Sequence, residues 1–182
     1  ADSVGQPVPC GDIRIMDDHG REVAPGESGE LWISGPMVSP GYWNNPEANA
    51  REFTAGHWKS GDIGSMDAQG FVRIFDRKKD VINRGGYNIY SVELENLITG
   101  HPAVVECAVI PHPDEVLGEK IHVFVTRVDG QELGEDDIRQ FCRENLADYK
   151  TPDYVTIQEE PLPRNANGKL VKAGLKERLT GP

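Results

Sequence analysis

The sequence predicts an α+β protein in which a β-rich, barrel-like part is followed by a small α+β domain with three strands. Two observations lead to this fold class. Short stretches that alternate apolar and polar residues, separated by turns rich in glycine and proline, fill the first seventy-odd residues. Beyond residue 80, apolar residues at helical spacing alternate with β-branched runs. The charged run at 76–80 separates the two patterns, so we expect a β-rich part at 1–78 and an α+β domain at 79–182.

The β-rich part is expected to contain short strands that end at turn signals. The turn at 17–20 (DDHG) and the turn at 67–70 (DAQG) each combine aspartate with glycine. Strands at this spacing, joined by such turns, are typical of a small antiparallel barrel or sandwich. The expected strands are residues 13–16, 30–34, 63–66 and 71–75.

The α+β domain is expected to contain three strands and three helices. The first helix has Glu93 and Glu95 near its positive end, and Gly100 and Pro102 stop it. The expected strands are residues 104–110, 120–128 and 155–158. The expected helices are residues 91–99, residues 136–146 with one apolar stripe, and a closing helix marked by Leu175 and Leu179.

Composition narrows the class of protein. The 182 residues are 37% apolar and carry a formal charge of −11, which argues against a nucleic-acid binder but leaves room for one local basic pocket. Cys10, Cys107 and Cys142 are widely spaced and form no CxxC pair, so we expect neither a disulfide framework nor a metal site. There is no signal-peptide pattern and no apolar run near the ~20 residues that span a bilayer. A cytoplasmic location without a transmembrane segment is expected.

Asp62 lies in the segment 60–64 (SGDIG), whose glycines would let the backbone turn and expose a carboxylate beside a strand end. A carboxylate accepts two hydrogen bonds at once, which suits a vicinal diol. Arg77 follows the last β-rich strand, so it can lie near the same ligand, and its planar fork suits a phosphate or ribose oxygen. The alternative for Asp62 is a turn aspartate that bonds its own backbone. Lys79 stands in the charged run, which is consistent with an exposed and mobile linker or with an ordinary solvated surface.

Two further segments contain candidate residues. Gly85 and Gly86 have no Cβ atoms, so a narrow substrate could pass close to the backbone, although the same pair could simply make a turn before the helix at 91. Lys169 follows the turn signal Asn167-Gly168 and is expected on a projecting loop. A mobile positive charge there could stabilise negative charge that develops in a transfer reaction, and a solvated lysine at a hairpin tip is the alternative.

The five histidines, at positions 19, 57, 101, 112 and 122, form no i, i+4 pair and are expected to be structural or solvated.

The segments 57–62 (HWKSGD), 76–96 (DRKKDVINRGGYNIYSVELEN) and 161–172 (PLPRNANGKLVK) resemble, in order and spacing, the C-terminal third of the adenylate-forming acyl-CoA synthetases. The similarity covers nearly the whole chain. Upstream of Asp62 there is neither the Ser/Thr/Gly-rich phosphate loop nor the aromatic-Gly-x-Thr-Glu segment of that family. We therefore expect the chain to be a fragment, with a β-rich remnant of the large AMP-binding domain followed by the mobile C-terminal domain, and to be inactive alone.

The resemblance implies an AMP-forming ligase that condenses a carboxylic acid with ATP and then passes the acyl group to the thiol of coenzyme A. ATP would bind as its magnesium complex, with the metal held outside this chain. The resemblance assigns Asp62 to the two ribose hydroxyls, Arg77 to the nucleotide, and Lys169 to the charge between carboxylate and α-phosphate. It makes Lys79 the hinge of the small domain.

For the second step, the resemblance implies that Gly85 and Gly86 line the path of pantetheine. Arg84, together with Lys150, is a candidate for the 3′-phosphate of coenzyme A. Asn83 departs from relatives that have a lysine there, which leaves its part in thioester formation open. Lys59 and Ser60 replace a commoner Arg-Thr pair and leave Asp62 in place.

Two other functions are alternatives. A peptide-synthetase adenylation domain also ends in Gly-Lys, but its loop after the hinge is usually rich in Lys-Ile-Arg, whereas residues 83–88 (NRGGYN) are more similar to the ligases. A non-catalytic binding or regulatory module would not need Asp62 and Lys169. The acyl substrate cannot be inferred, because its pocket lies in the missing region, and a homo-oligomer is left open.

Overall fold

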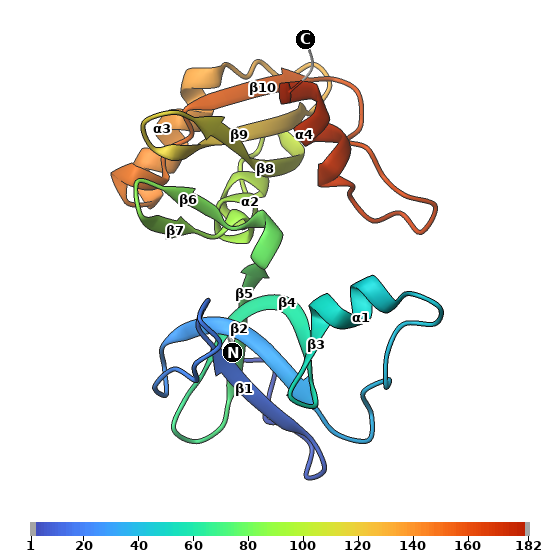
Figure 1. The fold of residues 1–182 in the computed structure, drawn as a ribbon. Coiled ribbons are helices and arrows are strands. Elements are labelled where there is room, and N and C mark those ends of the chain that lie inside the picture. The colour runs from blue at the N-terminus through green and yellow to red at the C-terminus, as the bar shows by residue number, and fades with distance from the viewer. Residues whose placement is uncertain (1–2, 181–182) are drawn as a thin grey trace. The chain divides into compact units, whose positions relative to one another are not determined.

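The computed structural model describes residues 3–180, and the chain divides into two compact units, Ala1–Lys79 and Asp80–Pro182 (Figure 1). We call them unit 1 and unit 2. Each of the three hydrophobic clusters lies inside one unit. None of the helices within residues 3–180 is both long enough and apolar enough to cross a membrane.

Unit 1 is a curled antiparallel sheet in which β1, β2, β4 and β3 are neighbours in that order and β5 pairs with β4 (Figure 1). The four expected strands are present, and the small core consists of Ile15, Leu31 and Val72. Two short elements were not predicted, the strand β3 and the helix α1. The elements are β1 (Asp12–Met16), β2 (Ser28–Ser34), α1 (Pro46–Glu52), β3 (Phe53–Thr54), β4 (His57–Met66) and β5 (Val72–Arg77).

Unit 2 has a five-stranded sheet, so the prediction of three strands is wrong, although the α+β class is confirmed. The strands β10, β9, β6 and β7 follow one another, and β8 pairs with β9. The two missed strands form a hairpin around Gly85 and Gly86, the pair that was expected to border a substrate path or to make a turn. The strands are β6 (Ile82–Arg84), β7 (Tyr87–Ile89), β8 (Val104–Asp114), β9 (Gly118–Arg127) and β10 (Tyr154–Gln158).

Helices cover both faces of the unit 2 sheet. Helix α2 (Ser91–Thr99) and helix α3 (Glu135–Asn145) contribute buried residues to the larger cluster, which includes Val123 and Val125 of β9. Helix α4 (Lys172–Thr180) packs Leu175 into a second cluster with Phe124, whose side chain points to the opposite face of β9. Strand β10 is parallel to β9, and α3 lies in the connection between them.

The segment at 76–80 differs from the exposed and mobile linker that the sequence suggested. Strand β5 continues to Arg77 because Asp76 and Arg77 still pair with β4. The next residues, Lys78–Asp80, form a short 3-10 helix, η1. The charged run therefore has regular secondary structure, in spite of its lack of apolar residues.

Candidate functional site

Asp62 and Arg77 face each other across the last strand pair of unit 1. They are Cα partners in the antiparallel pairing of β4 with β5, and Arg77 Nε lies 3.1 Å from Asp62 Oδ1. The Asp62 carboxylate therefore pairs with a side chain across the sheet, while its own N–H donates to Ser60 Oγ at 3.0 Å. Ion pairing uses one carboxylate oxygen, and a carboxylate offers further lone pairs for ligand hydroxyls. The Asp62 side chain is 27% exposed, so a ligand can reach it.

A bulge in β4 places Asp62 at this position. In the pairing of β4 with β2, Lys59 is opposite Trp32 and Ile63 is opposite Glu30. Four positions of β4 therefore span only two positions of β2. The extra residues on β4 bend the strand, and Gly61 supplies a φ of +72° that few other residues adopt readily. The glycine pattern around Asp62 therefore has a local structural cause.

Arg77 of this pair lines a cationic depression of about 480 Å³ in unit 1. Lys78 is one of its basic residues, and its ammonium pairs with Asp18 at 2.9 Å and Glu30 at 3.1 Å. Burial opposes the charged form of Lys78, but the hydrogen bonds that its ammonium donates to Asp18 and Glu30 outweigh burial and raise the pKa of Lys78. Five basic and two acidic side chains line the depression on a chain with a net charge of −11. Carboxylates partly neutralise Arg51, Arg77 and Lys78, and the remaining excess of basic groups favours an anion such as a phosphate. The lining residues are Glu30, Arg51, Glu52, Lys59, Ser60, Gly61, Arg77, Lys78 and Lys79.

In unit 2, Gly85 and Gly86 form the tip of the β6–β7 hairpin. Their φ values of +59° and +87°, between the paired residues Arg84 and Tyr87, are those of a two-residue type I′ turn. The Gly85 N–H donates to the Leu117 carbonyl at 2.8 Å. A Cβ atom on Gly86 would meet nothing within 4 Å, so the space beside that glycine is open.

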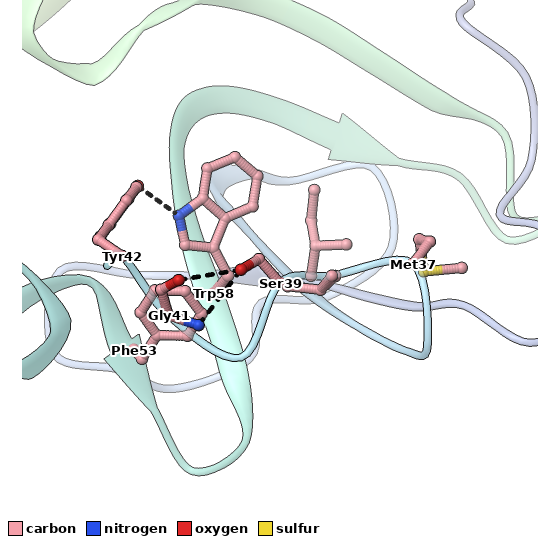
Figure 2. Close-up of a pocket in the computed structure, with 8 residues that line it drawn as sticks. Met37, Ser39, Gly41, Tyr42, Phe53 and Trp58 are labelled. Carbon is pink, nitrogen blue, oxygen red and sulfur yellow. Dashed lines mark hydrogen bonds between the residues drawn. The ribbon is translucent and has the colours of Figure 1, made fainter. Parts of the chain in front are cut away.

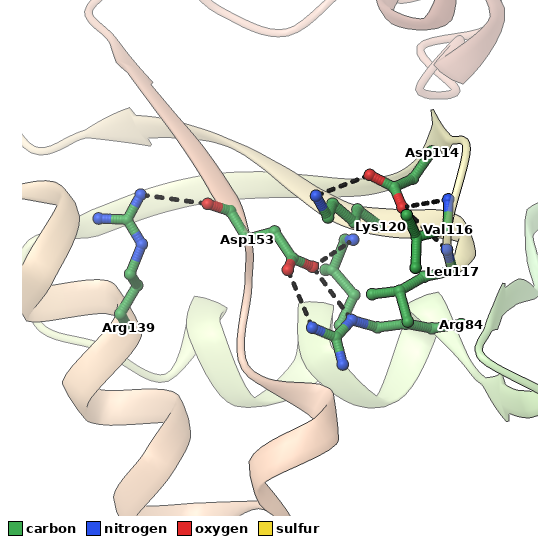
Figure 3. A network of polar contacts seen from close by, with 8 residues as sticks. Arg84, Asp114, Val116, Leu117, Lys120, Arg139 and Asp153 are labelled. Atoms are coloured by element: carbon green, nitrogen blue, oxygen red, sulfur yellow. Dashed lines mark hydrogen bonds and ion pairs between the residues drawn. The ribbon is translucent and has the colours of Figure 1, made fainter.

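Arg84 is held inside a network of ion pairs (Figure 3). Its guanidinium bonds both carboxylate oxygens of Asp153, at 2.9 Å and 3.2 Å, and Asp153 also accepts the Ile121 N–H at 3.0 Å. The Lys150 ammonium is likewise paired, at 2.6 Å and 2.7 Å, with the carboxylate of Glu93. Both cations proposed for a coenzyme A phosphate are thus already partly neutralised by carboxylates, and that assignment stays a prediction.

The β8–β9 turn beside the Gly85-Gly86 hairpin is fixed by Asp114 (Figure 3). Its carboxylate accepts from Lys120 Nζ at 2.6 Å and from the N–H groups of Leu117 and Val116. These hydrogen bonds, that of Lys120 foremost, lower the pKa of Asp114 to about 2. The turn therefore presents Val116, which is 89% exposed, from a well-ordered backbone.

Lys169 stands at the end of a loop that is tightened by Asn165. The Asn165 side-chain oxygen accepts the N–H groups of Asn167 and Lys169, both at 3.0 Å, and Gly168 has a φ of +76°. Gly168 N–H donates to the carbonyl of Asn165, so the turn centres on Ala166 and Asn167, one residue earlier than the predicted Asn167-Gly168 turn. The Lys169 side chain is exposed and has no hydrogen-bond or ion-pair partner among residues 3–180.

The structure gathers the candidate residues into two sets, one in each unit. Asp62, Arg77 and Lys79 belong to unit 1, and the last of these lies in η1 and lines the cationic depression. Arg84, Gly85, Gly86 and Lys169 belong to unit 2. Within residues 3–180 no group of three or more His, Cys, Asp or Glu side chains is arranged to hold a metal ion.

One contact between two histidines was not predicted from the sequence. His112 and His122 lie on neighbouring strands with their Nδ1 atoms 3.4 Å apart, and His122 Nε2 lies 2.8 Å from Thr156 Oγ1. Burial and the neighbouring His112 lower the pKa of His122 to about 4. Only the strand register brings these residues together, and no local motif signals it.

Unit 1 also has an apolar pocket of about 370 Å³ (Figure 2). The Trp58 indole N–H donates to the Tyr42 hydroxyl at 3.1 Å, and Ser39 bonds the Gly41 carbonyl beside it. The polar groups are thus satisfied among themselves, so the pocket contributes apolar surface rather than reactive groups. Its lining residues are Ile33, Met37, Val38, Ser39, Gly41, Tyr42, Phe53 and Trp58.

The chain is similar to known proteins over nearly its whole length. Residues 93–169 match the family described as AMP-binding enzyme C-terminal domain, and residues 1–43 match the AMP-binding enzyme family. Unit 1 and unit 2 are thus each similar to a part of the AMP-binding enzymes. It is 42% identical over 175 residues to a long-chain-fatty-acid–CoA ligase of Yersinia pestis, an alignment that covers 96% of this chain and 31% of the ligase.

Two solved structures of the family have the same fold. ATP-bound MatB from Rhodopseudomonas palustris superposes with a TM-score of 0.87 at 36% identity, over 97% of this chain and 35% of MatB. The o-succinylbenzoate CoA synthetase MenE from Bacillus subtilis, in complex with its acyl-adenylate OSB-AMP, has a TM-score of 0.87 at 36% identity, over 96% of this chain and 35% of MenE. The chain spans about a third of the length of these relatives, and it contains their C-terminal domain.

Proposed function

We propose that this chain is the C-terminal part of an AMP-forming carboxylic acid:CoA ligase. The observation that carries the proposal is the ion pair of Asp62 with Arg77, because Arg77 also lines the cationic depression. A carboxylate acceptor for a diol beside a surface that attracts phosphate is the arrangement that a ribonucleoside triphosphate requires. ATP-bound and acyl-adenylate-bound relatives of the same fold support the choice of nucleotide.

In the first half-reaction, Asp62 would accept hydrogen bonds from the ribose hydroxyls and Arg77 would contact the nucleotide. Lys169 would bring its ammonium to the reacting carboxylate and α-phosphate, where negative charge accumulates. Its exposure and lack of a partner within the described residues fit a group that must travel to its target. Magnesium would neutralise the phosphates when ATP binds, with its ligands outside this chain.

In the second half-reaction, the Gly85-Gly86 hairpin would border the path of the pantetheine thiol. The open space beside Gly86 supports this role, because a narrow aliphatic chain could pass there without displacing protein atoms. Lys79 would act as the hinge that exchanges the two sets of residues at the reaction centre.

The experiment is carried out on the full-length protein, with ATP–pyrophosphate exchange measured over fatty, aryl and dicarboxylic acids. Asp62→Ala should abolish exchange with every acid, since the ribose contact is common to all of them. Asp67→Ala is the matched control, because Asp67 is a turn aspartate that accepts the N–H groups of Gln69 and Phe71. Equal losses in the two variants would contradict the nucleotide role of Asp62.

We also predict that residues 1–182 alone neither form acyl-adenylate nor exchange pyrophosphate. Positioning of the reactants supplies much of the rate enhancement in transfer chemistry, and this chain lacks the family's phosphate loop. The purified chain is assayed beside the full-length protein with the same acids. ATP-dependent acyl-CoA synthesis by the shorter chain would contradict this prediction.

The two alternatives predict different results. A peptide-synthetase-type domain would exchange pyrophosphate with amino acids and would not release acyl-CoA. A non-catalytic module would show no exchange with any acid even at full length. The long-chain-fatty-acid–CoA ligase named above favours the ligase over both alternatives.

A further inference from the structure

The residue before the proposed hinge is anchored to unit 1. Lys78 bonds Glu30 at 3.1 Å, and the Glu30 side chain is only 11% exposed, so this pair is better shielded from water than a surface ion pair. The second partner of Lys78, Asp18, lies in the turn after β1 at 2.9 Å. Together with the Asp62–Arg77 pair, these contacts hold the chain to unit 1 up to residue 78.

The residue after the proposed hinge is anchored to unit 2. Asp80 is 7% exposed, and its carboxylate accepts from Lys176 Nζ at 3.2 Å. A carboxylate that is buried to this degree requires a charged or hydrogen-bonding partner, which Lys176 supplies. Helix α4 is itself fixed, because Leu175 is fully buried and Lys172 bonds Ser91 at 2.8 Å and Glu95 at 2.7 Å.

We propose that Lys78 and Lys176 are positioning residues that confine the pivot between the two units to Lys79. Each anchor lies within its own unit, so neither depends on how the units are oriented. A pivot of one residue has two backbone torsions and reaches few orientations, whereas a longer mobile segment reaches many. Only some orientations of the two units allow a half-reaction. If the molecules are spread over more orientations, a smaller fraction of them is in an orientation that allows it. The catalytic consequence rests on the proposed function, but the location of the pivot does not.

The test on this chain is backbone ¹⁵N relaxation across residues 77–81. In the wild type, the order parameter should fall at Lys79, while its neighbours stay near the value of about 0.85 that marks a rigid backbone. In Lys176→Met, the order parameters of Asp80 and Val81 should drop below about 0.6, the flexible range. In Lys78→Met, the order parameter should instead drop at residue 78 as well as at Lys79.

Two controls separate loss of the anchor from other effects. Lys120→Met removes an equivalent ion pair with Asp114, far along the chain from the hinge, and should leave residues 77–81 unchanged. Asp80→Asn keeps the shape of the side chain and removes its charge, and it should reproduce the effect of Lys176→Met. Unchanged amide shifts of α3, which contains none of the substituted residues, show in each variant that unit 2 remains folded.

Uniform mobility over residues 77–81 in the wild type overturns the proposal, as does a wild-type profile in both Lys176→Met and Lys78→Met. In the full-length protein, Lys176→Met should slow both half-reactions by a similar factor, because it lowers the fraction of molecules in each of the two competent orientations. The relaxation result decides where the pivot lies even if the full-length protein forms no acyl-CoA, so failure of this inference is distinguishable from failure of the proposed function.

Discussion

Lys169 combines a rigid backbone with a mobile charge. Asn165 fixes the loop through two backbone N–H groups, while the lysine amine reaches into solvent. The cost of ordering the loop is therefore met before any substrate binds, and only the side chain has to be immobilised. Such an arrangement suits a group that stabilises charge in one half-reaction and withdraws for the other.

Replacement of Lys169 should therefore separate the two half-reactions of the full-length protein. Lys169→Ala is expected to slow acyl-adenylate formation by about 10²-fold or more, the usual loss when a preorganised electrostatic contact is removed. Thioester formation from supplied acyl-adenylate should be nearly unchanged. Both steps are measured separately by rapid quench, with Arg143→Ala, which removes an exposed charge from α3, as control. Equal slowing of both steps would contradict the assigned role.

His122 should make the stability of unit 2 depend on pH. Its folded pKa of about 4 lies below the ordinary value of 6.5, so the unfolded chain binds more protons between these values. The stabilising contribution of neutral His122 is fully present above pH 6.5 and is lost as the pH falls towards 4. The free energy of unfolding should decrease over that window by up to about 3 kcal/mol.

Urea titrations followed by circular dichroism at pH 4, 5, 6 and 7 measure this dependence. His122→Gln keeps a polar group near Thr156 but does not titrate, so its stability should vary less over the same window. A pH dependence that is identical in the variant and the wild type would place the titrating group elsewhere.

Individual residues show which part of the site local sequence could predict. Asp62 and Arg77 were expected near one ligand because each follows a recognisable strand or turn, and the structure pairs them at 3.1 Å. The partner of Arg84 was not predictable in this way, since Asp153 lies 69 positions further along the chain. Ion pairs of this kind depend on tertiary packing, which no local pattern encodes.

At the level of elements, the sequence predicted the helices and strands that have a periodic apolar pattern or clear end signals. Helix α2 was expected at its observed bounds because acidic residues begin it and Gly100 ends it. Strands β6 and β7 were missed because each has only three residues, too few to show alternation. Helix α1 has a readable signal, Asn45 before Pro46, with the Asn45 side chain accepting the Ala48 N–H at 3.1 Å. Its seven residues are too short for a periodic pattern.

The β6–β7 hairpin allows a controlled test of the pantetheine path. Gly86→Trp would place a large side chain in the open space beside the turn and should slow thioester formation more than adenylation. It would also strain the backbone, because Gly86 has a φ of +87°. Gly130→Trp is the matched control, since Gly130 has a φ of +72° and also has nothing within 4 Å of an added Cβ.

Both half-reactions are measured for the two tryptophan variants of the full-length protein. Only Gly86→Trp is expected to change the ratio of the two rates, and both variants should lose similar stability. If Gly130→Trp changes the ratio as much, strain rather than obstruction explains the effect.

At the scale of the whole molecule, the two units differ in how much apolar surface they bury. The cluster of unit 1 has Ile15, Leu31 and Val72 at its centre, whereas unit 2 has two clusters that include nearly all the fully buried side chains. Burial of apolar area is the main favourable term in folding, so unit 2 should be the more stable. The apolar pocket of unit 1 is exposed surface, so its apolar area does not contribute to the stability of unit 1.

The positions of the tryptophans make this difference measurable. Trp32, Trp43 and Trp58 all lie in unit 1, while the three longer helices lie in unit 2. In a urea titration, tryptophan fluorescence should therefore report unit 1, and circular dichroism at helical wavelengths should report mainly unit 2. We expect the fluorescence midpoint at lower urea than the dichroism midpoint, because non-coincident transitions are the mark of units that unfold separately.

A matched pair of core substitutions tests whether each probe reports its own unit. Leu31 is 3% exposed in unit 1 and Leu94 is fully buried in unit 2, and removal of a buried leucine side chain typically costs about 2–5 kcal/mol. Leu31→Ala should shift only the fluorescence midpoint, and Leu94→Ala should shift only the dichroism midpoint. If either substitution moved both midpoints together, the two units would unfold as one cooperative body. The domain boundary at residue 79 would then have no counterpart in the stability of the chain.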